Sequence, residues 1–240
     1  MRISSVVKRS NQSFMKKFFV SVLVMVLALG SLSGQNLDRF FSTTKGDTFT
    51  YTIYAPNGNV EYKYTYTNKE VSGADLSDAA VIYEYQFWEG NGKPLFEDEG
   101  KMEMKITLNS EGTTSYMNDM KKSMAIQDVV TMGDVSSLPS DMKVGMNVPD
   151  GKINIKVKSV GASFLLTDRK VLAQEEITTP AGTFQTYKMD ENQTNKVLIS
   201  TKTFHIVTWY AKNIGCIKQE VYDKKGKLLR TLELTSLVQR

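Results

Sequence analysis

Apolar and polar residues alternate with a period of two along most of this chain, and this constrains the fold more than any other feature. Phe49, Tyr51 and Ile53 share one face of a predicted strand, with threonines between them. An Asn-Gly turn within residues 56–59 then leads into a second predicted strand, since this pair tolerates positive φ. Such alternation is typical of antiparallel strands that bury one face. The chain is therefore predicted to be mainly β.

Aromatic residues occupy one face of two neighbouring predicted strands, at residues 60–67 and 80–88. They are Tyr62, Tyr64, Tyr66, Tyr83, Tyr85 and Phe87. On a concave surface such rings would suit a lipophilic or carbohydrate ligand, whereas against a second layer they would be core. We name these six as candidate ligand-binding residues, with core packing as the competing interpretation.

The first 34 residues have the composition of a secretory signal peptide. A basic head precedes an apolar run from Phe18 to Leu29, and small residues fill positions 30–34. As a helix that run would span about 18 Å, well short of a hydrocarbon core of about 30 Å. We predict cleavage near Gly34, which leaves no transmembrane segment, and a single exported domain over residues 35–240. An uncleaved anchor is the alternative, and Met15 is a second possible start.

Removing the signal changes the charge balance. The full chain has 30 Lys and Arg against 26 Asp and Glu, and five of the basic residues lie within residues 1–34. The remaining chain has 25 basic against 26 acidic residues, a net charge of −1. It has no basic excess that would recruit nucleic acid or anionic lipid.

Methionine gathers in the middle of the chain, at residues 116–147. Met117, Met120 and Met124 have helical spacing, so we predict a short helical or irregular Met-rich insertion here. It would be core filling or a flexible lid over an apolar cavity. Because no low-complexity linker divides the chain, we predict one curved antiparallel sheet or an incomplete β-barrel.

The last third is predicted to be a strand meander with sharp corners. Thr179-Pro180-Ala181-Gly182-Thr183-Phe184 forms one corner, because proline fixes φ and glycine permits a turn. Trp209-Tyr210-Ala211 leads into another, before Gly215. Between them, Asp190-Glu191-Asn192-Gln193 is predicted as a polar turn that ends one strand, with the next beginning at Lys196.

These corners, together with Tyr187-Lys188, resemble the TapB-like family of exported Bacteroidetes proteins of unknown function. Asp168-Arg169-Lys170-Val171 and Val144-Gly145 also look like family positions. The resemblance is best over residues 144–237. It implies a curved, mostly antiparallel sheet and supplies no catalytic residues.

Residues that could carry catalysis or bind metal are few. His205 is the only histidine and Cys216 the only cysteine, each in an apolar setting, so neither thiolate–imidazole catalysis nor a zinc site has support. Glu175-Glu176 and Asp190-Glu191 are adjacent carboxylates, but neighbours in a strand point to opposite faces. A glycosidase needs two carboxyls roughly 5–10 Å apart across one cleft. We predict no catalytic residue, no metal and no cofactor.

These observations predict an exported, non-catalytic protein of the periplasm or cell envelope, at the periphery of the outer membrane of a Gram-negative bacterium or secreted. It would bind a lipophilic or glycan-like ligand, or an envelope protein, on a curved β-sheet. An integral outer-membrane β-barrel is one alternative, because about eight strands fit this length. A carboxylate-dependent hydrolase of envelope polymers is the second.

Overall fold

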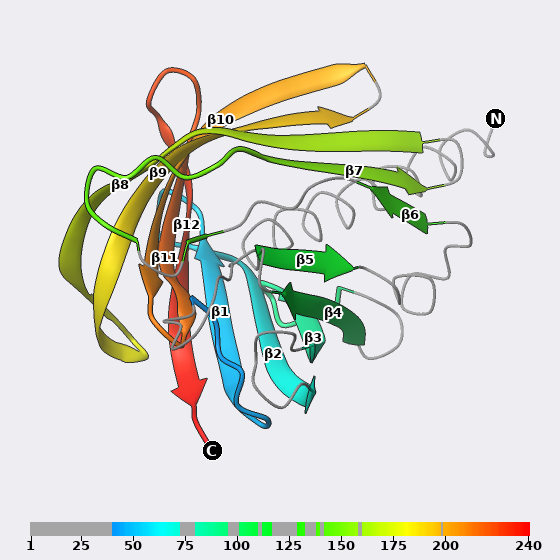
Figure 1. Ribbon diagram of the computed structural model, residues 1–240, viewed down its shortest axis with the longest axis vertical. Coiled ribbons are helices and arrows are strands. Elements are labelled where there is room, and N and C mark those ends of the chain that lie inside the picture. Colours follow the sequence, from blue (N-terminus) through cyan, green and yellow to red (C-terminus); the bar gives the residue numbers. More distant parts are fainter. Residues whose placement is uncertain are drawn as a thin grey trace.

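The computed structural model describes residues 40–72, 80–95, 101–109, 112–116, 129–132, 138–139, 142–157, 160–197 and 199–240 (Figure 1). The predicted signal peptide at residues 1–34 lies outside them, as do Met117, Met120 and Met124 of the predicted insertion. Within the described ranges, no helix has the length and apolarity required to span a membrane.

The described secondary structure consists of twelve strands in one sheet. They are β1 (Thr48–Tyr54), β2 (Val60–Ser72), β3 (Ala80–Glu89), β4 (Lys101–Asn109), β5 (Gly112–Tyr116), β6 (Val129–Met132), β7 (Gly151–Val157), β8 (Val160–Thr179), β9 (Gly182–Val197), β10 (Ser200–Ala211), β11 (Gly215–Tyr222) and β12 (Leu228–Val238). The spatial order is β5-β4-β3-β2-β1-β12-β11-β10-β9-β8-β7-β6. The prediction of a mainly β chain is confirmed.

Each described strand pairs with its neighbours in sequence except β5 and β6, which do not pair with each other, and the first and last strands also pair. These two, β1 and β12, pair antiparallel in the middle of the sheet, with Thr48 opposite Val238. Strands β5 and β6 consequently take the two ends of the sheet, which is not closed into a barrel. The sheet curls, so that β8 also contacts β11 and β12 (Figure 1). The predicted single curved antiparallel sheet is confirmed.

Side chains on the inner side of this curve form one hydrophobic cluster, the core. Phe49, Tyr51 and Ile53 belong to it and are each at most 2% exposed, as their alternation predicts. Phe40, ahead of β1, enters the same cluster and packs edge-on against Tyr187, with ring centroids 5.6 Å apart. The core thus joins the segment ahead of β1, which we call the chain entry, to strands from both halves of the sheet.

The two predicted corners are present. Strand β8 ends at Thr179 and β9 begins at Gly182, whose φ is +135°. Strand β10 ends at Ala211 and β11 begins at Gly215. A side chain at this last glycine would place its Cβ 3.1 Å from the carbonyl oxygen of Phe40, so the corner packs directly on the chain entry.

The predicted turn at residues 190–193 is wrong, because β9 runs unbroken through it to Val197. Three of the four polar side chains find partners on neighbouring strands, and the fourth, Gln193, bonds within β9. Asp190 bonds to His205, Glu191 to Arg169, Asn192 to Asp168 and Gln193 to Asn195. Cross-strand partners make a polar sequence compatible with a strand, and a local pattern carries no sign of them.

A bulge in β8 lies where residues 144–148 contact residues 169–171. Gly145 donates its N–H to the carbonyl of Val171, and Val148 donates to that of Arg169, both at 2.8 Å. Opposite this contact, β8 shifts register against β9 between Thr167 and Lys170, and Asp168 has φ of +55°. The side chain of Arg169 is buried as a result, while Asp168 stays exposed.

Candidate functional site

The six aromatic residues predicted to bind a ligand lie in or against the core. Tyr64, Tyr83, Tyr85 and Phe87 are each at most 3% exposed, and Tyr62 and Tyr66 are partly buried. The rings contact one another: Tyr85 stacks on Phe87 with centroids 5.7 Å apart, and Tyr64 stacks on Tyr51 at 4.9 Å. Their faces are therefore covered by other rings of the sheet.

The adjacent carboxylates Asp190 and Glu191 point to opposite faces of β9, as expected for neighbours in a strand. Glu191 is buried on the inner face, where its carboxylate accepts a bond from Arg169 Nε at 2.9 Å. Asp190 lies on the outer face, by which we mean the side of β8–β11 opposite the core, and is 2.5 Å from His205 Nε2. This pair does not form a two-carboxylate cleft.

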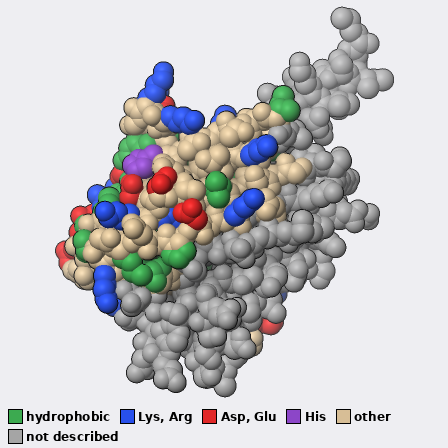
Figure 2. Space-filling model, turned by 45° about the horizontal axis from the view of Figure 1, so that its top comes forward, with side chains coloured by type: hydrophobic (Ala, Val, Ile, Leu, Met, Phe, Trp, Pro, Cys, Tyr) green, Lys and Arg blue, Asp and Glu red, His purple; other side chains and the backbone are tan. Residues whose placement is uncertain are grey.

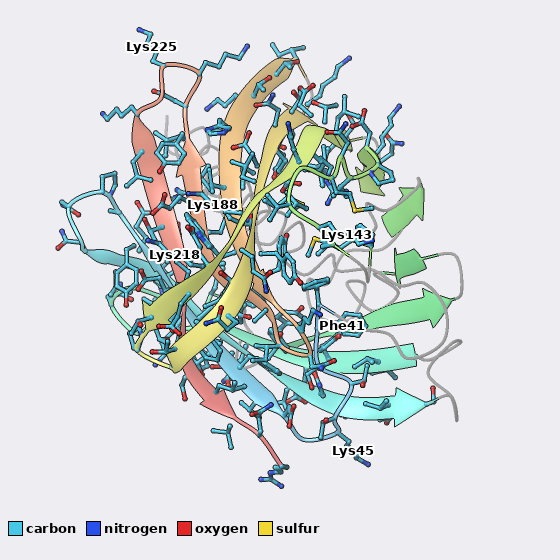
Figure 3. The ribbon with its side chains drawn as sticks, turned by 60° about the vertical axis from the view of Figure 1, so that its left-hand side comes forward. Phe41, Lys45, Lys143, Lys188, Lys218 and Lys225 are labelled. Carbon is cyan, nitrogen blue, oxygen red and sulfur yellow. The ribbon has the colours of Figure 1, made fainter. Side chains whose placement is uncertain are left out.

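The outer face carries a row of interacting polar and aromatic side chains, and Figure 2 shows its histidine beside acidic groups. At one end, Trp209 donates its indole N–H to Glu175 Oε1 at 2.5 Å. Lys188 and Lys218, both labelled in Figure 3, lie over the indole ring, 5.0 and 5.3 Å from its centroid. This buried tryptophan and its two lysines anchor the row by cation–π contacts.

The row continues along β11 towards His205. Lys218 pairs with Glu220 at 2.9 Å, and the Tyr222 hydroxyl donates to the same carboxylate. Burial opposes ionisation of Glu220, but hydrogen bonds from Tyr222 and Lys218 outweigh it and lower the pKa of Glu220. Burial and the bond to Glu220 raise the pKa of Tyr222 to about 12. The Tyr222 ring lies 5.6 Å from His205.

Substitution Tyr222→Phe tests this coupling. We expect the pKa of Glu220 to rise towards its ordinary value, because a donor to its charged form is lost. The lowered pKa of Glu220 stabilises the folded protein above the ordinary glutamate range, and this stabilisation is lost as pH falls through the lowered pKa. In the variant we expect it to be smaller by about 0.5–1 kcal/mol, since the group is only half-buried. A carboxyl NMR titration with urea unfolding at pH 4 and 7 measures both, with Tyr54→Phe as the control. An unchanged Glu220 titration in Tyr222→Phe would contradict the assignment.

Beyond His205 the strands β10 and β11 separate and form a fork. His205 opposite Tyr222 is the last pair between them, whereas β10 from Ser200 to Phe204 stays paired with β9. Strand β11 instead turns into the β11–β12 hairpin, and Figure 1 shows the two hairpins diverging. Within the fork is a surface hollow of about 500 Å³. It is lined by Asn192, Thr203, Phe204, His205, Asp223, Lys224 and Gly226.

The lining of the fork is held in place on both sides. Asp223 Oδ1 accepts the backbone N–H groups of Lys225 and Lys227 at 2.8 and 3.0 Å, and these bonds lower the pKa of Asp223. Across the hollow, Asn192 Nδ2 donates to Asp168 at 3.0 Å. The hollow falls within the range of about 300–1,000 Å³ typical of ligand sites. It combines hydrogen-bonding groups with one phenylalanine ring, which suits reversible binding.

The other candidate groups for chemistry lie apart. Cys216 is buried on the core side, and burial raises the pKa of its thiol. Among the described residues, no cluster of three or more His, Cys, Asp or Glu could hold a metal ion. The sequence placed His205 in an apolar setting and gave no indication of the fork. The polar residues 190–193, which were predicted to form a turn, were the sequence feature that came closest to indicating the fork.

The fold and the fork define a class of protein: an open, curved antiparallel meander with a small surface hollow beside its only histidine. The chain belongs to the DUF3108-like family, whose model matches residues 44–234. The family description states no function. No curated protein matches the chain.

Two solved structures share the fold. One, from Bacteroides fragilis, is described as an exported protein with a YmcC-like fold; it is 23% identical, covers 83% of this chain and 99% of that chain, and has a TM-score of 0.67. The other, from Parabacteroides distasonis, is described as a lipoprotein; it is 22% identical, covers 85% of this chain and 100% of that chain, and has a TM-score of 0.69. At these identities the likeness concerns the fold.

Proposed function

We propose that this protein is an exported, non-catalytic binding protein of the cell envelope that takes up its partner in the fork between β10 and β11. The observation that carries the proposal is the hollow of about 500 Å³, open between two hairpins and lined by hydrogen-bonding side chains. The signal-like residues 1–34 and the narrower resemblance of the corners to TapB-like exported proteins support export. The descriptions of the two structural neighbours point the same way.

The state of the candidate catalytic groups supports a binding role. His205 is paired with Asp190, and its neighbour Tyr222 is a poor nucleophile because its pKa is raised to about 12. The thiol of Cys216 lies in the core and its pKa is raised by burial. A nucleophile must be activated by a lowered pKa or an adjacent base, whereas the pKa values of Tyr222 and Cys216 are both raised.

The position of the aromatic rings also favours the fork over the inner face. Tyr64, Tyr85 and Phe87 are covered by other rings, so a lipophilic ligand there would have to displace core packing. The side chains of the fork can bind a partner without disturbing the core.

Site-specific photocrosslinking in the native envelope tests the proposal. A photoreactive residue at Thr203 or Lys224, both lining the hollow, is expected to give one discrete adduct. Positions Glu176 and Ser236, which are exposed elsewhere on the sheet, serve as matched controls and should give none. Mass spectrometry then assigns the adduct as protein, glycan or lipid. Equal labelling at all four positions, or no labelling in the fork, would contradict the proposal.

A further inference from the structure

We infer that the fork binds an extended acidic peptide segment, which adds as a strand to the free edge of β10 at Ser200–Phe204. The inference rests on the proposed function and names the chemistry of the partner.

Among the residues that the structure describes, β10 is paired on one side only over its first five residues. Ser200 to Phe204 face Val197 to Gln193 of β9, and pairing with β11 starts at His205. Within the described strands, the opposite edge of this segment has no partner. An unpaired edge presents backbone N–H and C=O groups that can accept a further strand. Five residues extend about 17 Å, which suits a short peptide.

The hollow lies along this edge. Thr203 and His205 share the outer face of β10, whereas Phe204 projects to the other face, yet all three line the hollow. Consecutive residues of one strand, whose side chains point to opposite faces, border the same space where that space lies beside the edge of the strand. A strand entering there would meet the backbone of β10 directly. Phe204 and Thr203 would flank its alternate side chains.

The charge around the fork selects the partner. Five exposed lysines lie on the two hairpins that form the fork, two on the β9–β10 hairpin and three on the β11–β12 hairpin, and Lys224 among them lines the hollow. They are Lys196, Lys202, Lys224, Lys225 and Lys227. Three carboxylates lie in or beside the hollow and each is already engaged: Asp223 by backbone N–H groups, Asp190 by His205 and Asp168 by Asn192. The excess of positive charge attracts an acidic segment and repels the same edge of a second copy.

Exposed lysines also guard sheet edges against unwanted pairing. That role and the proposed one differ in outcome, because a guarded edge rejects every strand, whereas a selective edge accepts an acidic one. The hollow between the hairpins supplies room for the added strand, which guarding alone does not require.

Fluorescence anisotropy with three synthetic peptides tests the inference on the purified chain from residue 35. The first is a nine-residue peptide of alternating Glu and Val, the second replaces Glu with Lys, and the third is the Glu–Val peptide with alternate backbone nitrogens methylated. We expect binding of the first alone, weakening as salt rises. On the protein, Lys224→Glu with Lys225→Glu should lower affinity about tenfold or more. Lys45→Glu with Lys63→Glu is the charge-matched control, and Figure 3 shows Lys45 far from Lys225.

Amide hydrogen exchange reports the geometry. Binding of the Glu–Val peptide should protect amides within Ser200–Phe204 and leave those of β1 unchanged. Equal binding of the methylated peptide, or binding without this protection, would reduce the site to charge attraction and overturn the inference. So would no binding, or dimerisation through this edge in light scattering. A glycan or lipid adduct in the photocrosslinking experiment would refute the peptide and leave the binding function standing, whereas no adduct would refute both.

Discussion

Arg169→Met is expected to lower the free energy of unfolding by about 3–5 kcal/mol, because it leaves the Glu191 carboxylate buried without its partner. Both side chains are at most 3% exposed and their bond is 2.9 Å long. Arg169 also donates to the carbonyl of Pro149 at 2.7 Å, so its loss loosens the segment that holds the β8 bulge. Urea unfolding measures the effect.

The pH dependence of this variant has a definite sign. Burial raises the pKa of Glu191, and Arg169 opposes that rise. Without the arginine the pKa of Glu191 rises further, so the unfolded chain releases its proton at lower pH than the folded one. Stability then falls as pH increases above the ordinary glutamate range. The variant should therefore lose more stability at pH 7 than at pH 4.5.

The control for this prediction removes both charges. Arg169→Met combined with Glu191→Leu should recover much of the lost stability, since no buried charge is left unpaired. If the double variant is as unstable as the single one, the effect comes from packing or from the lost bond to Pro149. A single variant within about 0.5 kcal/mol of the parent would show that the pair does not matter.

Tyr85→Ala is expected to cost about 3–5 kcal/mol, as for other large aromatic truncations in a core. The ring is 1% exposed and lies 5.3 Å from Tyr66 and 5.7 Å from Phe87. For a chain of this length the loss corresponds to a fall of roughly 6–20 °C in Tm. Thermal unfolding followed by near-ultraviolet circular dichroism measures it.

The same substitution separates core packing from ligand binding at the predicted aromatic residues. Tyr62→Ala is the matched control, because that ring is only partly buried against the core, and it should cost about 1 kcal/mol. Comparable small losses at both positions would favour an open aromatic surface kept for a ligand. A large loss at Tyr85 alone indicates that these rings hold the sheet together.

Much of the fold could be predicted because the signal is local. The alternation of Phe49, Tyr51 and Ile53 specifies which face of β1 is buried, and it does so within seven residues. Pro180 and Gly182 similarly determine a corner, because proline fixes φ and glycine permits a positive φ. The opposite orientation of Asp190 and Glu191 also follows from strand geometry once a strand is present.

The error at residues 190–193 shows where local reasoning fails. Four consecutive polar residues look like a turn when they are expected to face water. They continue β9 because three of them, Asp190, Glu191 and Asn192, have partners on β8 and β10, namely His205, Arg169 and Asp168. Partners that lie 15 to 24 residues away decide the outcome, and no window along the chain contains them together with the geometry of the bulge.

The sequence by itself determined the strand content, the alternation of faces and the two sharp corners, since each depends on neighbouring residues and on backbone sterics. Only the tertiary structure decided that β1 pairs with β12 and that Arg169 is buried beside Glu191. It also decided that β10 extends beyond its pairing with β11, which opens the fork. These features depend on register between distant segments. Register follows from the packing of the whole sheet, which a local pattern does not record.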